Sequence, residues 1–171
     1  RFTDAVRVAS AILTEEQDHI YDAAIFVRYT QTIIEQMGAL LGLSNMAIVP
    51  ELSVQDGIQA ARIGNSVGDV GAAVQELVEA NGFSVVREFV GHGVGRAMHE
   101  EPQVPNEFDP SIRDVLTEGL VITIEPTISA GSAMPVESRD RWTLRTADGS
   151  LAAHCEHTLI ITRGEPTILA A

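Results

Sequence analysis

The chain has 171 residues, of which 45% are hydrophobic, so it is long and apolar enough to bury a sizeable core within one domain. Eleven basic residues stand against 24 acidic ones, and the net charge of -13 argues against nucleic acids and anionic membranes as partners. The single cysteine, Cys155, excludes an internal disulfide framework and favours a reducing compartment. No apolar run approaches the ~18 residues of a membrane span. We therefore expect a globular cytoplasmic protein without a membrane partner.

The N-terminal part of the chain follows a helical pattern. In residues 1–43, apolar side chains recur at spacings of three and four. A loop is expected over residues 44–50. A further helix is expected from about Val54 to Ile63, with Ser53 as its N-cap.

The middle of the chain alternates between helix and strand signals. Ser66 and Asp69 have the spacing of a helix N-terminal cap, and Asn81-Gly82 predicts the end of that helix. A cap is therefore a better explanation of Asp69 than a metal ligand. A strand-like run follows at residues 83–90, and residues 120–124 predict a short buried strand. The expected fold class is α+β.

The last third of the chain has the pattern of loops and strands. A loop is expected over residues 129–141. Asp148-Gly149 is a strong turn signal and predicts a hairpin between residues 142–146 and 151–162. In the second of these strands, side chains alternate between two faces, so His154 shares a face with Glu156, while Cys155 and His157 point the other way.

One stretch, residues 91–106, combines two histidines with several glycines and prolines. Two glutamates follow in strand-like settings, Glu125 at the end of an apolar strand and Glu156 inside another. A buried carboxylate must be paired, protonated or bound to a cation, because burying an isolated charge is costly. Imidazole with carboxylates suits Mn, Fe, Co or Zn, and the lack of thiolate partners argues against a structural zinc site. His92, Glu125 and Glu156 therefore indicate a metal site, with salt-bridge and loop roles as the alternative.

The neighbours of Glu156 have their own expected roles. His154 shares the face of Glu156, so a polar pocket-wall role is expected for it. His157 points away and is expected to be structural or to support the site. Cys155 is expected to be a small packed residue.

Several motifs in order resemble those of type I methionine aminopeptidases, which have the pita-bread metallopeptidase fold. They are Gly91-His92-Gly93-Val94-Gly95-Arg96, Met98-His99-Glu100-Glu101-Pro102, Val104-Pro105-Asn106, Ile124-Glu125-Pro126, Trp142-Thr143, Asp148-Gly149-Ser150-Leu151 and Glu156-His157-Thr158. The resemblance implies a pita-bread fold of which only the second half is present. Residues 54–171 would form this aminopeptidase-like half-domain, and residues 1–53 a helical N-terminal segment of unassigned role.

The resemblance implies the removal of N-terminal methionine from nascent proteins by a site with two divalent ions (Co, Mn, Fe or Zn). His92, Glu125 and Glu156 match three of the family's metal ligands. Glu156 matches the carboxylate that bridges both metals. Glu125 matches the ligand that also accepts a proton from the attacking water.

The resemblance also implies residues that contact the substrate. His99 matches a histidine that hydrogen-bonds the substrate amide. Met98 and Trp142 match walls of the pocket for the methionine side chain, and ordinary core packing is the alternative explanation for both.

The family's remaining two metal ligands are aspartates that have no recognisable counterpart in this chain. The aspartates upstream that could be considered are Asp4, Asp18, Asp22 and Asp56. Three ligands alone predict at most one weakly bound metal ion. Three interpretations therefore stay open: an enzyme completed by the N-terminal segment or a second chain, a non-catalytic binding module, and a truncated gene product. A sheet edge exposed by the missing half predicts self-association.

Overall fold

The computed structural model describes residues 45–171, and the helical pattern expected for residues 1–43 lies outside this part. Residues Val49–Ala171 form a compact unit of their own. The domain boundary expected after residue 53, between the helical N-terminal segment and the half-domain, remains a prediction. The elements in chain order are η1 (Asn45–Ala47), α3 (Val49–Ala60), α4 (Val67–Ala80), β1 (Ser84–Val85), β2 (Gly91–Gly93), β3 (Glu100–Val104), β4 (Val121–Ile124), β5 (Thr127–Ser129), β6 (Pro135–Glu137), β7 (Leu144–Thr146), β8 (Ala152–His154), β9 (His157–Ile160) and β10 (Thr167–Ala170).

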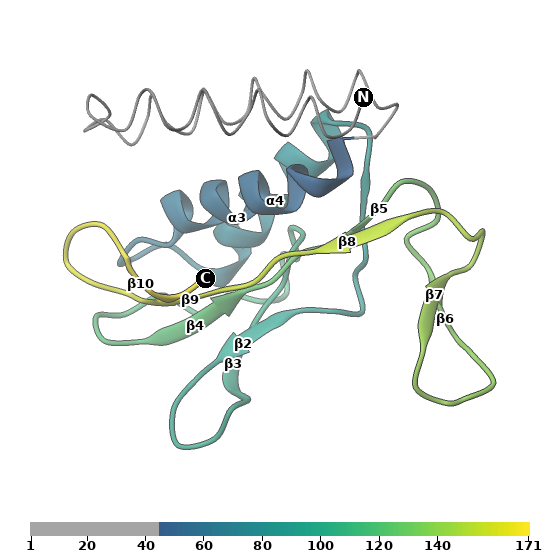
Figure 1. Ribbon diagram of the computed structural model, residues 1–171. Coiled ribbons are helices and arrows are strands. Elements are labelled where there is room, and N and C mark those ends of the chain that lie inside the picture. The colour runs from purple at the N-terminus through teal and green to yellow at the C-terminus, as the bar shows by residue number, and fades with distance from the viewer. Residues whose placement is uncertain (1–44) are drawn as a thin grey trace, which may run out of the picture. The chain divides into compact units, whose positions relative to one another are not determined.

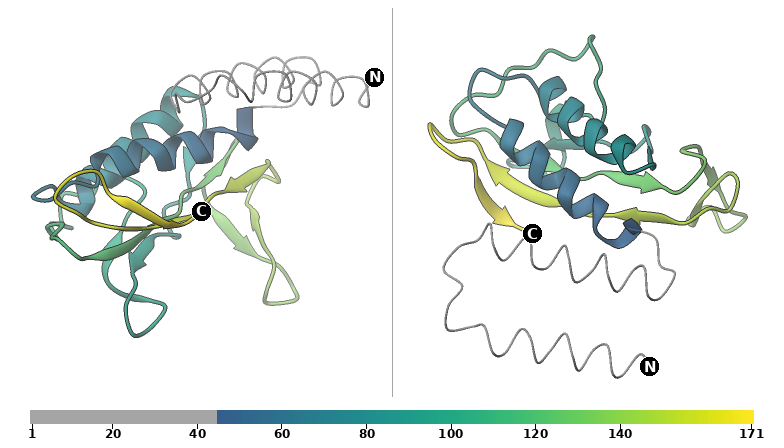
Figure 2. Two further views of the ribbon diagram at one scale, coloured as in Figure 1. Left: turned by 60° about the vertical axis from the view of Figure 1, so that its left-hand side comes forward. Right: turned by 90° about the horizontal axis from the view of Figure 1, so that it is seen from above.

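The strands of this unit form three antiparallel sheets. The largest has the order β10-β9-β4-β2-β3, a second has the order β1-β5-β8, and β6 pairs with β7. Helices α3 and α4 lie side by side over one face of the five-stranded sheet (Figures 1 and 2). No helix among residues 49–171 covers the opposite face, toward which the β2–β3 loop and the β6–β7 hairpin project (Figure 1).

The core lies between these two helices and the sheet. Its fully buried side chains include Val74 of α4 and Ile124 of β4. Burying an aliphatic side chain of this size contributes roughly 1.5–3 kcal/mol relative to leaving it exposed. Gly57 of α3 allows close packing here, because a Cβ atom at this position would lie 3.0 Å from Val74 and 3.2 Å from Ile124.

Helix α4 begins as its sequence predicts. The Ser66 side chain accepts a hydrogen bond from the Asp69 N–H, and the Asp69 carboxylate accepts one from the Ser66 N–H at 2.7 Å. This reciprocal capping box satisfies two N–H groups that the first turn leaves free. The Asp69 carboxylate also accepts from the Ser66 hydroxyl, and the hydrogen bonds from the Ser66 N–H and hydroxyl lower the pKa of Asp69.

Helix α3 starts earlier than expected. It begins at Val49, so the predicted loop over residues 44–50 and the predicted cap at Ser53 are wrong. Proline fits the first turn of a helix because its missing N–H has no partner there in any case, and Pro50 therefore continues the helix rather than delaying it. Ser53 is buried inside the helix, where its hydroxyl donates to the Pro50 carbonyl at 2.7 Å.

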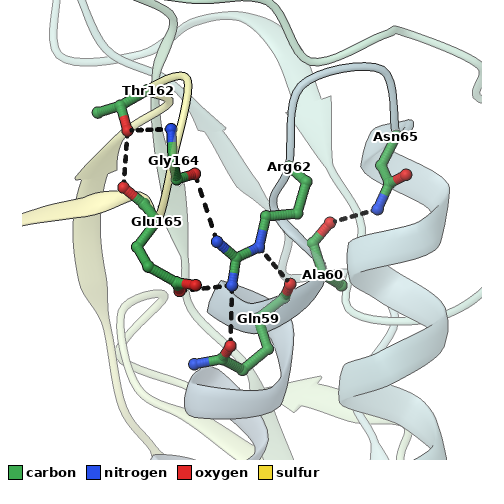
Figure 3. Close-up of polar contacts among 7 residues, drawn as sticks. All are labelled: Gln59, Ala60, Arg62, Asn65, Thr162, Gly164 and Glu165. Atoms are coloured by element: carbon green, nitrogen blue, oxygen red, sulfur yellow. Dashed lines mark hydrogen bonds and ion pairs between the residues drawn. The ribbon is translucent and has the colours of Figure 1, made fainter.

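The end of α3 is tied to the turn between β9 and β10 (Figure 3). The Arg62 guanidinium donates to the carbonyls of Gln59 and Gly164, and it forms an ion pair with Glu165. Asn65 donates to the Ala60 carbonyl, the last of the helix. These bonds occupy carbonyls that a helix end leaves free, and they end α3 at Ala60 rather than at residue 63.

The predicted hairpin around Asp148-Gly149 forms its turn but not its strand pair. Gly149 has a φ of 76° and donates to the Thr146 carbonyl at 3.1 Å. The flanking strands separate, because β7 pairs with β6 and β8 pairs with β5. Asp148 accepts hydrogen bonds from the N–H groups of Ser132 and Ser150, which ties the turn to the loop after β5. β6 lies inside the predicted loop over residues 129–141.

No helix within residues 45–171 is both long and apolar enough to cross a membrane.

Candidate metal centre

The chain passes twice between the five-stranded and the three-stranded sheets. β4 leads into β5 through Glu125 and Pro126, and β8 leads into β9 through Cys155 and Glu156. Because β4 pairs with β9 and β5 pairs with β8, these two joints lie opposite each other. Pro126 has no N–H to offer a partner strand, but its carbonyl accepts from the Cys155 N–H at 3.4 Å. The fold thus places a glutamate of each joint at the same point of the molecule.

The side chains at this point form a cluster of oxygen and nitrogen donors. Ligand atoms of Glu125, His154 and Glu156 all lie within 4.8 Å of one another. His92 Nε2 lies 3.3 Å from Glu125 Oε1. Glu125 is close both to His92 and to Glu156, so the structure brings together the three residues expected as metal ligands. His154 is a fourth residue at the same place. We refer to these four residues as the centre.

His92 is positioned by the close pairing of β2 with its neighbours. A Cβ atom at Gly91 would lie 2.3 Å from the Thr123 carbonyl oxygen, and one at Gly93 would lie 2.2 Å from that of Glu101, so only glycine fits at either position. The Nδ1 atom of His92 lies 2.8 Å from the Gly93 carbonyl, which can only accept. Nδ1 is therefore placed to donate to this carbonyl, which leaves Nε2, on the side of Glu125, as the ring nitrogen that can bind a metal ion.

Thr123 joins His92 to Glu125, a role that sequence analysis missed. Its hydroxyl accepts from the His92 N–H at 2.9 Å and donates to Glu125 Oε1 at 2.8 Å. The Thr123 side chain is buried. The available signal was its place two residues before Glu125, on the same face of a strand. Asn106 adds a second link, because its amide donates to the Phe89 carbonyl at 2.9 Å and to that of Glu125 at 3.4 Å.

The residues expected to contact substrate lie at the surface. His99 is exposed in the loop between β2 and β3, and its ring centroid is 4.2 Å from that of His92. The Met98 and Trp142 residues are 74% and 89% exposed, so neither is part of the core of the described unit. The roles expected for these three residues remain predictions.

A second cluster occupies the other side of the joint before β9. The Cys155 thiol donates to Glu51 Oε2 at 2.9 Å, and Glu51 Oε1 lies 3.5 Å from His157 Nε2. Burial and the contact with Glu51 raise the pKa of Cys155 to about 12. Burial opposes ionisation of Glu51, but the hydrogen bonds from Cys155 and Gln55 together lower its pKa. The predicted alternation of residues 154–157 between two faces is confirmed, because His154 and Glu156 belong to one cluster and Cys155 and His157 to the other.

The donor atoms of the centre fit a divalent metal ion. Carboxylates held this close repel each other when both are ionised, and a cation between them removes that penalty. Carboxylate oxygen with imidazole nitrogen is a donor set that suits Mn, Fe, Co and Zn. Thr123 and the Gly93 carbonyl orient Glu125 and His92 from behind, as supporting groups do in metal sites.

Of the upstream aspartates considered as additional ligands, Asp56 alone lies in the described part of the chain. It lies on α3 and lines a groove between the helices together with Glu76 of α4. Burial and the neighbouring Glu76 charge raise the pKa of Asp56. Asp56 is therefore a residue of the helix pair rather than a further ligand at the centre. The other candidates lie outside the described residues.

Comparison with known proteins gives one consistent result. Residues 46–163 match metallopeptidase family M24. The methionine aminopeptidase of Clostridium perfringens (strain 13 / Type A) is 46% identical over 121 residues, which are 71% of this chain and 49% of that protein.

The solved structures agree with this match. Methionine aminopeptidase from Rickettsia prowazekii superposes with a TM-score of 0.70 at 36% identity, covering 75% of this chain and 52% of that one. The enzyme from Thermotoga maritima also gives 0.70, at 42% identity, covering 73% of this chain and 50% of that one. The expected α+β pita-bread fold is thus confirmed, and the chain spans about half the length of these relatives. The chain belongs to metallopeptidase family M24.

Proposed function

We propose that this chain takes part, as a metallo-aminopeptidase, in the removal of N-terminal methionine from nascent proteins. One observation carries the proposal: Glu125, His154 and Glu156 converge within 4.8 Å, beside His92, in a chain of metallopeptidase family M24. The similar proteins that span this region bear the name methionine aminopeptidase. We propose the cytoplasm as its place of action, because nascent chains emerge there and a lone cysteine is typical of reducing compartments.

In this proposal His92, Glu125 and Glu156 hold the divalent ion, which is Co, Mn, Fe or Zn. His154 lies close enough to Glu125 and Glu156 to join them. When bound, a divalent ion lowers the pKa of a water molecule and stabilises the oxyanion formed from the scissile carbonyl. A second ion would need ligands beyond those of the centre.

The side chains around the ion have distinct tasks. Glu125 accepts the proton of the attacking water, and the hydrogen bond from Thr123 holds one of its oxygens in place. His99 lies next to His92 and donates to the substrate amide. Met98 and Trp142 are exposed and thus available to line a pocket for the methionine side chain.

A second candidate function is a binding module that keeps the fold and part of the metal site without turnover. It is favoured by the position of Asp56, which faces Glu76 in the helix groove and leaves the centre without an aspartate among residues 45–171. A site with only one ion would bind a peptide N-terminus but activate water less well.

The test is hydrolysis of a methionyl tripeptide by the full chain, stripped of metal and then supplied with Co(II) or Mn(II). We expect turnover that depends on the metal and falls to background in Glu125→Gln, which keeps the size of the side chain but cannot accept the proton. Glu118→Gln is the matched control, because Glu118 is an exposed carboxylate that pairs with Arg163 away from the centre. Its turnover should equal that of the unaltered chain.

Three outcomes separate the candidates. Metal-dependent turnover that survives Glu118→Gln and is lost in Glu125→Gln supports the aminopeptidase. Metal binding that requires Glu125 and Glu156, without turnover, supports the binding module. Absence of metal binding at the centre rejects both.

A further inference from the structure

The cluster of Glu51, Cys155 and His157 has no task in the proposed reaction. Its side chains belong to three places in the fold: the first turn of α3, the joint between β8 and β9, and the first residue of β9. Ligand atoms of all three lie within 4.8 Å of one another. A thiol, an imidazole and a carboxylate thus meet between a helix and the sheet that it covers.

We propose that Glu51, Cys155 and His157 form a second metal site, which binds a thiophilic divalent cation of the zinc type independently of the centre. Cysteine sulfur, histidine nitrogen and glutamate oxygen are the donors that zinc uses in proteins. The thiolate distinguishes this site from the centre, whose donors are oxygen and nitrogen alone and also suit manganese.

One ligand atom from each of the three residues lies within 4.8 Å of the other two. Bonds of about 2.0–2.3 Å to zinc place neighbouring ligand atoms of a tetrahedral site about 3.3–3.8 Å apart. Glu51 Oε1 lies 3.5 Å from His157 Nε2, and Cys155 Sγ lies 3.9 Å from His157 Nδ1, so an ion would take one of the two ring nitrogens. The hydrogen bond of 2.9 Å between Cys155 Sγ and Glu51 Oε2 would open as the thiol loses its proton and the Glu51 side chain rotates to make room for the ion.

The backbones of His157 and Cys155 are held by hydrogen bonds to neighbouring strands and joints, whereas the Glu51 side chain can adjust its position. His157 is 5% exposed and pairs with Ile124 in the sheet, and the Cys155 N–H is bound to the Pro126 carbonyl. The Glu51 side chain is 44% exposed and is supported by Gln55, whose amide donates to it at 2.8 Å. The site therefore has two donors on anchored backbone and a third, partly exposed donor that can adjust to an ion. Because the Glu51 side chain is partly exposed, water can reach the site and would supply the fourth ligand.

An ion at this site would connect α3 to β9 directly. The structure connects these elements through the Cys155–Glu51 hydrogen bond and the Glu51–His157 contact. Because the unfolded chain does not keep the three donors together, binding stabilises the folded form. Zinc is thus expected to raise the Tm of the chain through this site.

The test uses Co(II) as the probe, because cobalt bound to a thiolate gives a charge-transfer absorption band in the near ultraviolet that oxygen and nitrogen ligands do not give. The full chain is reduced, stripped of metal and titrated with Co(II). We expect the thiolate band to saturate when one Co(II) is bound at this site, apart from any Co(II) that the centre takes up, and to vanish in Cys155→Ser, an isosteric change whose fold is checked by circular dichroism. Zn(II) should displace the band.

Two further variants separate this site from the centre and from a lone reactive thiol. Glu156→Gln removes a donor of the centre and should leave the band unchanged, so the result is independent of peptide hydrolysis. Glu51→Gln should weaken Co(II) affinity at this site about tenfold or more. An absent band at saturating Co(II), or a band of unaltered affinity in Glu51→Gln, would overturn the proposal and leave a hydrogen-bonded link between α3 and β9.

Discussion

Residues 154–157 supply two neighbouring clusters that differ in chemistry. His154 and Glu156 join Glu125 in an arrangement of oxygen and nitrogen donors open to the surface, whereas Cys155 and His157 join Glu51 beneath α3. From the end of β8 through the joint to the start of β9, consecutive side chains point to opposite sides, so a single short segment serves both clusters.

The two clusters also differ in how their members are supported. The centre is held by strand neighbours, since Thr123 bonds both His92 and Glu125. The second cluster depends on the packing of a helix, since Glu51 comes from α3. A substitution can therefore disturb one cluster and spare the other, which makes their independence measurable.

The largest effect is expected from removing one donor of the centre. Glu156→Gln should weaken Mn(II) affinity by about 100-fold or more, because few other donors remain to hold the ion. Cys155→Ser should leave Mn(II) affinity within about twofold, because manganese prefers oxygen and nitrogen to sulfur. Calorimetric titration of both variants measures this difference, and an equal loss in both would mean that the clusters share one ion.

A smaller effect is expected from the supporting residue of the centre. Thr123→Val keeps the shape of the side chain but removes the hydroxyl that bonds His92 and Glu125, and should reduce Mn(II) affinity about 10- to 100-fold. Thr123→Ser keeps the hydroxyl and should bind nearly as well as the unaltered chain. The same titration measures both. If Thr123→Val bound Mn(II) normally, Thr123 would be a packing residue only.

The smallest effect is expected away from both clusters, at the start of α4. Ser66→Ala removes half of the capping box and should cost about 1 kcal/mol in the free energy of unfolding. Affinities for Mn(II) at the centre and for Co(II) at Cys155 should not change. Urea denaturation gives the first quantity, and a change in either affinity would show that the clusters respond to fold stability in general.

The same cap has a pH dependence of known sign. Hydrogen bonds from Ser66 lower the pKa of Asp69 in the folded chain. A carboxyl with a lowered folded pKa stabilises the fold above its unfolded pKa, near 3.8, and this contribution is lost as the pH falls through the folded value. Asp69→Asn should flatten the stability curve in that acidic range, and an unchanged curve would contradict the capping role.

Local signals predicted local structure well. The cap of α4 and the apolar strand β4 follow from neighbouring residues, and both are present. The hairpin at Asp148-Gly149 is only half correct, because the turn is local but each flanking strand pairs with a distant one. Strand partners depend on the whole sheet, which turn chemistry does not encode.

The sequence predicted three residues of the centre but did not predict the cluster of Glu51, Cys155 and His157. His92, Glu125 and Glu156 were predicted from their residue types and strand-like settings and then from the motif resemblance. Their convergence is explained by two opposed strand joints, which no single stretch of sequence reveals. Glu51 was missed because Pro50 was interpreted as part of a loop, which placed the helix start beyond it. Glu51 is far from Cys155 and His157 in the sequence, so their contact follows only from the packing of α3 on the sheet.

The most direct test of the centre is the position of a bound metal ion. Crystals of the full chain grown with Mn(II) should give anomalous density between the carboxylates of Glu125 and Glu156, within bonding distance of a histidine of the centre. Density at that point, and none at Cys155, would establish the oxygen and nitrogen cluster as the manganese site. Well-ordered crystals without manganese at that point, at an ion concentration that saturates binding in solution, would contradict the account.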